Sequence, residues 1–180
     1  LKDPRSPEDQ IADSIKEEIE ALNIPPSHSF YDSFGKGTMG FAFSRKFGAT
    51  CPVPIDASQR PTKRPVRHDL YITDEVRNER RLKLCDEEYG KFISEMWFSV
   101  RQAIESEQIR ELPEDVMAEG CMREYKNIQG NKIDVEPKDE MKERIGKSPD
   151  LFDWLCLLME GARRHGFRIE RLGKNVIVDT

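Results

Sequence analysis

An alternation of helical and strand patterns in the first third of the chain limits its possible folds more than any other feature. Patterns typical of a helix, a strand, a helix and a strand follow one another over residues 6–22, 28–32, 40–47 and 51–56. The first helix begins at a Ser-Pro pair, and the first strand ends at Asp32. A glycine-rich turn over 33–40 separates that strand from the second helix. This order favours an α/β fold with a parallel sheet.

The composition is that of a globular chain with a strongly solvated surface. Of its 180 residues, 37% are hydrophobic and 35% are charged. We expect a single domain over residues 1–180, because this length can bury one core. The longest apolar run is only a few residues, so we expect no contact with a membrane. The net charge of −5 does not favour a general polyanion binder, although local patches matter more than the sum.

The cysteines and histidines do not form a metal-binding pattern. The four cysteines contain no Cys-x-x-Cys pair, and the three histidines are far apart in the sequence. Both observations argue against a structural zinc site. Scattered cysteines favour reduced thiols and therefore a cytoplasmic protein.

Residues 57–83 interrupt the alternation with a basic, proline-broken segment. Lys63, Arg64 and Arg67 lie in it, and further basic residues follow up to residue 83. We expect an excursion from the sheet with one short strand over 70–72, and no second domain. The charge predicts a patch for nucleic-acid phosphates. Nearby acidic residues dilute that charge, so a plain solvated loop is an equally good interpretation.

The remaining patterns predict further helices and a hairpin. A long helix over 88–106 has an apolar stripe that places Trp97 in the core. A glycine turn at 129–131 predicts a hairpin over 123–135. Shorter helices are expected over 113–121 and 137–146, and edge strands over 167–171 and 175–178.

The stretch around residue 150 opens another helix and places two carboxylates in its first turns. Ser148 is expected to be the N-cap, with Pro149 at the first helical position. Asp150 lies at the end favoured by the helix dipole. Asp153 lies one turn later between Phe152 and an adjacent tryptophan, where a carboxylate needs a partner such as a metal ion. A charged helix start without further function is the alternative.

Residues 136–153 contain a lysine-rich helix, the sequence Gly-Lys-Ser-Pro-Asp and a second Asp, one after another. Together with three further segments, they resemble the nuclease domain of the large terminase subunits of tailed phages, whose C-terminal signature has these parts in this order. Residues 31–37 resemble its strand-end Asp and glycine turn. Residues 94–101 are similar to its helix with a Glu-x-Trp motif, and residues 112–115 also match in place.

The resemblance implies a fold and a site. The fold would be RNase H-like, a mixed α/β sheet flanked by helices, with carboxylates holding two Mg²⁺ or Mn²⁺ ions at one end of the sheet. Asp32 and Asp153 would be catalytic metal ligands, with Asp150 as an alternate or supporting ligand. The basic residues of the signature would face the DNA backbone or balance the acids, namely Lys138, Arg144 and Lys147. The family's first strands and ATPase domain have no counterpart here, so we expect the C-terminal part of a larger protein.

The resemblance also implies a function. The chain would be a metal-dependent endonuclease, encoded by a phage or prophage, that cuts concatemeric viral DNA during genome packaging in the host cytoplasm. Its partners would be double-stranded DNA, the terminase small subunit and the portal.

Two alternatives have different consequences. A non-catalytic DNA-guiding module with a degraded acid site would bind DNA with a strong salt dependence and no metal dependence. An unrelated α/β interaction domain would use Asp32 as a turn residue and Asp153 as a helix-start residue.

Overall fold

The computed structural model describes residues 3–33, 37–74 and 76–171. Its contacts divide the chain into two compact units, Leu1–Ser58 and Gln59–Thr180, and each unit is described by itself. The expectation of a single domain over residues 1–180 stays a prediction.

The first unit has the predicted alternation of helices and strands. In chain order it contains α1 Pro7–Ala21, β1 Phe30–Asp32, α2 Thr38–Phe47 and β2 Val53–Ile55, with a 3-10 turn Pro26–His28 before β1. The hydroxyl of Ser6 accepts a hydrogen bond from the backbone N–H of Asp9, so the predicted Ser-Pro helix start is confirmed. β1 and β2 pair in parallel, with Phe30 opposite Val53, as the alternation predicted. The predicted glycine turn falls partly on residues 34–36, outside the described residues.

The core of the first unit forms where α1, α2 and β1 meet. Ala12 and Phe43 are buried there, and Tyr31 from β1 packs its ring 4.8 Å from that of Phe43. Ala42 of α2 is fully buried in the same cluster. This packing fixes β1, and with it the position of Asp32 at the strand's C-terminal end.

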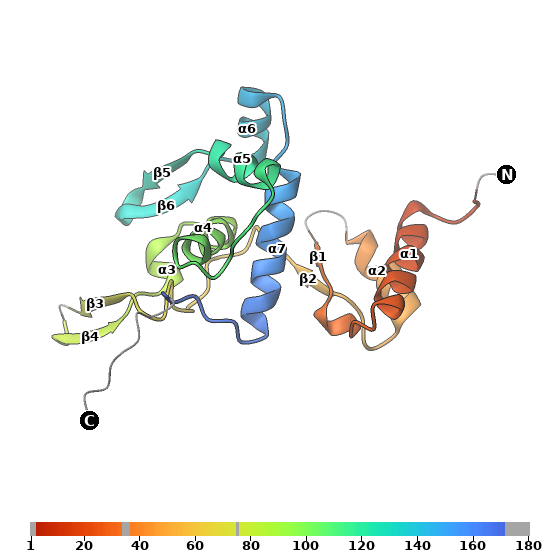
Figure 1. Cartoon of the computed structure of the whole chain (residues 1–180), viewed down its shortest axis with the longest axis horizontal. Helices are drawn as coiled ribbons and strands as arrows, with labels where there is room; N and C mark the ends of the chain where they lie inside the picture. Colours follow the sequence, from red (N-terminus) through yellow and green to blue (C-terminus); the bar gives the residue numbers. More distant parts are fainter. Residues whose placement is uncertain (1–2, 34–36, 75, 172–180) are drawn as a thin grey trace. The chain divides into compact units, whose positions relative to one another are not determined.

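The second unit is mainly helical, with two antiparallel hairpins (Figure 1). Its elements are β3 Tyr71–Asp74, β4 Glu79–Leu82, α3 Cys85–Glu88, α4 Phe92–Glu105, α5 Glu114–Met122, β5 Tyr125–Ile128, β6 Lys132–Val135, α6 Lys138–Ile145 and α7 Asp150–Arg164, with a 3-10 turn Gln129–Asn131 inside the second hairpin. The sequence patterns predicted the helix α4, the hairpin β5–β6 and the helices α6 and α7. The short helix α3 was not predicted.

The core of the second unit lies between α4 and α7, which cross and pack against each other (Figure 1). Phe92, Met96 and Val100 of α4 are buried, as the apolar stripe predicted, together with Leu155 and Met159 of α7. α5 packs on the start of α7. A Cβ on Gly120 would lie 2.2 Å from a ring carbon of Phe152, so glycine is required for this close approach.

Residues 57–83 and 167–171 differ from the predictions. The short strand predicted at 70–72 is present as β3, but it pairs with a second strand, β4, that was not predicted, with Tyr71 opposite Leu82. Residues 167–171 form no strand. Alternation alone does not make a strand without a partner strand, and the segment is held by single hydrogen bonds instead, such as that from the backbone N–H of His68 to the carbonyl of Ile169. The strand predicted at 175–178 lies outside the described residues.

The described helices and strands match the predicted fold class. Small parallel and antiparallel sheets are combined with flanking helices, so the mixed α/β prediction is confirmed. Within the described ranges, every helix is too short or too polar to cross a bilayer.

Candidate active site

Two carboxylates at the start of α7 converge on one ammonium group. Lys138, the first residue of α6, donates hydrogen bonds from Nζ to Asp150 Oδ1 at 2.8 Å and to Asp153 Oδ2 at 2.9 Å. The two acids are three residues apart on one helix, so their side chains lie on the same face. The hydrogen bond from Lys138, with a second one from Ser148, lowers the pKa of Asp150. Burial acts to lower the pKa of Lys138, but the bonds to both acids outweigh it and the pKa is raised.

Asp153 has a second set of neighbours on its inner side. Trp97 of α4 donates its indole N–H to Asp153 Oδ1 at 3.3 Å, and Arg123 Nη1 lies 3.6 Å from the same oxygen. The ring of Trp97 packs at a tilt of 40° against Phe152 with centroids 4.3 Å apart, and the guanidinium of Arg123 lies 4.5 Å from the centre of that indole. Burial lowers the pKa of Arg123, although the nearby charge of Asp153 opposes this. A carboxylate between apolar neighbours was expected to need a partner, and Asp153 has two buried ones, Trp97 and Arg123.

The helix start differs from the prediction. α7 begins at Asp150, Pro149 precedes it, and the hydroxyl of Ser148 donates to Asp150 Oδ1 at 2.9 Å. The predicted N-cap role of Ser148 is therefore wrong. The free N–H groups of the first turn bond instead to a side chain from another helix, because Oε2 of Glu119 accepts from Leu151 and Phe152.

Asp32 belongs to the first unit, whereas Asp150 and Asp153 belong to the second. Asp32 is exposed at the end of β1, as predicted. That Asp32 lies close to Asp153 stays a prediction. Within residues 3–33, 37–74 and 76–171, no group of three or more histidine, cysteine or acidic side chains is placed to hold a metal ion. Asp150 and Asp153 nevertheless fit a hard cation, because two carboxylates already converge on one positive charge.

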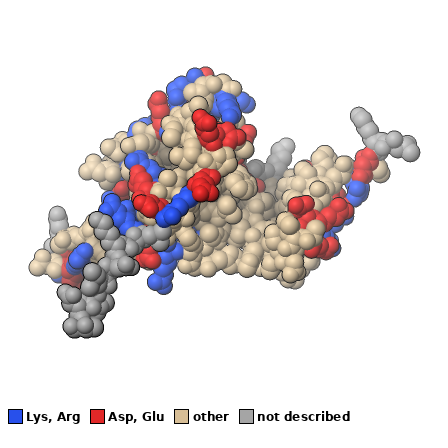
Figure 2. All heavy atoms as spheres, viewed as in Figure 1, with Lys and Arg blue, Asp and Glu red and all other residues tan. Residues whose placement is uncertain are grey.

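The predicted DNA-binding residues have different surroundings. Lys63 is exposed. Arg67 is paired with Asp69 at 2.5 Å, and Arg144 with Glu136 at 2.6 Å. Lys147 lies 2.8 Å from the buried carboxylate of Glu119. On the face drawn in Figure 2, positive and negative side chains of the second unit lie interspersed and are not gathered by sign.

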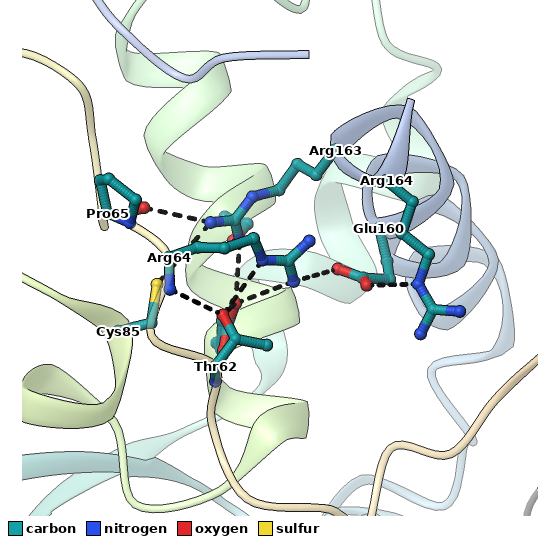
Figure 3. Close-up of polar contacts among 9 residues, drawn as sticks. Thr62, Arg64, Pro65, Cys85, Glu160, Arg163 and Arg164 are labelled. Atoms are coloured by element: carbon teal, nitrogen blue, oxygen red, sulfur yellow. Dashed lines mark hydrogen bonds and ion pairs between the residues drawn. The ribbon is translucent and has the colours of Figure 1, made fainter. Parts of the chain in front are cut away.

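Arg64 lies in a buried network that the sequence did not predict (Figure 3). Its guanidinium donates to Glu95 Oε1 at 3.0 Å and to Glu160 Oε2 at 2.6 Å. Glu95 is fully buried and also accepts from the backbone N–H and hydroxyl of Thr62 and from Arg163. These contacts tie the segment before α3 to α4 and α7. The position of Glu95 inside the apolar stripe of α4 was the signal that could have indicated it.

An apolar cavity of about 330 Å³ lies next to the neighbours of Asp153. Trp97, Arg123 and Phe152 line it together with further residues of α4 and residues of α5, β5 and β6. The two side chains next to Asp153 Oδ1 therefore also form part of the wall of an apolar cavity.

A comparison with solved structures identifies the fold. The chain is similar to the nuclease domain of the large terminase subunit gp2 of bacterial virus Sf6, with a TM-score of 0.54, 17% identity, and coverage of 82% of this chain and 70% of that one. The chain has the fold of a terminase nuclease domain. At this identity the likeness shows the RNase H-like fold that the sequence resemblance implied.

Two further structures of the same Sf6 domain match similarly. A lysine-to-alanine mutant with manganese and beta-thujaplicinol has a TM-score of 0.52 and 17% identity, and covers 84% of this chain and 71% of that one. The mutant with calcium has a TM-score of 0.52 and 16% identity, with coverage of 82% and 70%. No family model and no curated protein matches the sequence of this terminase-like chain.

Proposed function

We propose that this protein is a divalent-metal-dependent endonuclease that cuts concatemeric phage DNA during genome packaging. The observation that carries the proposal is the convergence of Asp150 and Asp153 on one cation at the start of α7. The terminase nuclease fold supports it, and so does the presence of manganese or calcium in the similar structures.

Three carboxylates are proposed to hold the metal ions. Asp153 and Asp150 would provide oxygen ligands from α7, and Asp32 would provide another from the end of β1. When bound, Mg²⁺ or Mn²⁺ supplies an activated water and stabilises the charge that builds on the scissile phosphate. Lys138 would offset part of the negative charge of the two α7 acids before metal binding, because its ammonium is paired with both carboxylates.

The basic residues are proposed to orient the DNA. Lys63 is exposed, so its ammonium is accessible to a phosphate. Arg67, Arg144 and Lys147 would have to share their charge with the acids that they contact. Arg64 would contribute least, since two buried carboxylates already bind its guanidinium. Double-stranded DNA is the proposed substrate, and the terminase small subunit and portal are the proposed partners in the host cytoplasm.

Plasmid nicking tests the proposal. We expect the protein to nick supercoiled DNA in Mn²⁺, and Asp153→Asn or Asp32→Asn to abolish nicking without a change in the circular dichroism spectrum. Asp139→Asn is a matched control, because Asp139 is an exposed acid next to Lys138 and should keep the wild-type rate. Full activity in both Asp153→Asn and Asp32→Asn would exclude the site.

A non-catalytic DNA-guiding module is the second candidate. The observation in its favour is that Lys138 already fills the position between Asp150 and Asp153 that a metal ion would take. This candidate predicts DNA binding that is equal in EDTA and in Mn²⁺ and falls steeply with salt, with no nicking. Nicking that requires Mn²⁺ excludes it.

A further inference from the structure

The two oxygens of the Asp153 carboxylate have different surroundings. Oδ1 faces inward and accepts from the indole N–H of Trp97 at 3.3 Å. Oδ2 accepts from Lys138 Nζ at 2.9 Å, and the Lys138 side chain is half exposed. One oxygen is therefore held from the core, and the other is presented to a cation at the surface.

The Trp97 side chain is well suited to hold Oδ1 of Asp153 in one position. Its ring is buried, with the centre of the Phe152 ring 4.3 Å away and the guanidinium carbon of Arg123 4.5 Å from its own centre. An indole has a single N–H donor and no acceptor, so a buried ring packed against both side chains sends its hydrogen bond in one direction. The direction of that bond is set by the packing of α4 against α7, and it does not depend on a flexible side chain.

Arg123 supports the same oxygen without bonding to it. Its Nε donates to the carbonyl of Glu136 at 2.7 Å, which anchors the guanidinium. Its Nη1 lies 3.6 Å from Asp153 Oδ1, beyond hydrogen-bond distance, and has no hydrogen-bond partner in the described part of the chain. Arg123 therefore adds positive charge near Oδ1 and stacks on Trp97, while Trp97 makes the directional contact.

We propose that Trp97 is a positioning residue for Asp153. The indole holds Oδ1, so that Oδ2 stays turned toward the cation that Lys138 supplies in this structure and a divalent metal supplies during catalysis. The identity of that cation rests on the proposed nuclease function. The orientation of the carboxylate by Trp97 does not depend on that function, so the two can be tested separately.

Direct Mn²⁺ binding, followed by the EPR signal of the free ion, tests the proposal without relying on activity. Trp97→Phe keeps an aromatic ring in contact with Phe152 and Arg123 but removes the N–H donor. We expect it to weaken Mn²⁺ binding about tenfold, the lower end of the range for groups that orient a metal ligand. Trp154→Phe is the matched control, because Trp154 is the other tryptophan, is 59% exposed and adjoins Asp153 in the sequence. It should bind Mn²⁺ as the wild type does.

The indole N–H resonance provides a second readout that needs neither metal nor a Trp97 variant. In Trp154→Phe protein labelled with ¹⁵N, the single indole signal belongs to Trp97. We expect Asp153→Asn to move this signal, because the acceptor changes from a carboxylate to an amide. A signal that stays in place overturns the positioning proposal.

The outcomes separate the two proposals. If Asp153→Asn loses Mn²⁺ binding while Trp97→Phe binds as the wild type does, the metal site stands and the positioning role fails. If neither the wild-type protein nor any variant binds Mn²⁺, the nuclease proposal fails. The indole signal alone then decides the role of Trp97.

Discussion

The carboxylate of Glu119 binds the backbone of Phe152 at the start of α7. Oε2 of Glu119 accepts from the N–H of Phe152 at 3.1 Å and from that of Leu151 at 2.8 Å, while Oε1 lies 2.8 Å from Lys147 Nζ. A negative charge here satisfies free N–H groups and interacts favourably with the helix dipole. The helix that carries both candidate acids is thus capped by a residue of α5.

Removing this cap should destabilise the protein. Glu119→Ala leaves two backbone N–H groups without their acceptor, so we expect the free energy of unfolding to fall by about 1–3 kcal/mol. Ser148→Ala is the control and should cost less than about 0.5 kcal/mol, since Ser148 does not cap the helix. Urea unfolding followed by circular dichroism measures both. A larger loss for Ser148→Ala would contradict the assignment of the cap to Glu119.

Removing the carboxylate of Glu95 from its buried network should lower the free energy of unfolding more than removing the Glu119 cap does. Glu95→Ala leaves Arg64 and Arg163 without a shared carboxylate in a buried site, and such losses cost about 3–5 kcal/mol. Glu105→Ala on the same helix should change stability by less than about 0.5 kcal/mol, because its pair with Arg101 is exposed. Thermal and urea unfolding of the two variants give the comparison. Similar stability in both variants would show that the network is not structural.

Alanine substitution of two neighbouring basic residues, Lys63 and Arg64, should have different effects on DNA binding and on stability. On the proposed function, Lys63→Ala should reduce the slope of log affinity against log salt by about one for plasmid DNA and leave the melting temperature unchanged. Arg64→Ala should instead lower the melting temperature, because Glu95 and Glu160 lose a partner. Fluorescence anisotropy across a salt series and a melting curve measure these effects. An unchanged salt slope in Lys63→Ala would make Lys63 a plain surface residue.

The cysteines should react in an order set by burial. Burial raises the pKa of Cys85 to about 12 and raises that of Cys156 well above its ordinary value. At pH 8 the reactive thiolate of Cys85 is then on the order of a thousandfold scarcer than for an ordinary thiol. Cys121 is exposed, so we expect Ellman's reagent to modify it first and Cys121→Ser to remove the fast phase. Rapid labelling of Cys85 in native protein would contradict its buried position.

The parts of the fold that follow from short-range patterns could be predicted from the sequence. The Ser6 cap and four-residue apolar steps define α1, and the apolar stripe of α4 with the glycine turn at 129–131 gives a helix and a hairpin. Each of these patterns depends on residues that are close together in the sequence. Residues 167–171 show the limit, because they alternate as a strand would but pair with no strand among the described residues.

Sequence patterns were sufficient to predict the order of helices and strands in the first unit, the place of Asp32 at a strand end, and the place of Asp150 and Asp153 at a helix start. How the two α7 acids are held depends on tertiary packing. Trp97 lies 56 residues from Asp153 in the chain, and the cap Glu119 lies 33 residues from Phe152. Hydrogen bonds and ion pairs over such separations exist only after α4, α5 and α7 pack together, so no local pattern contains them.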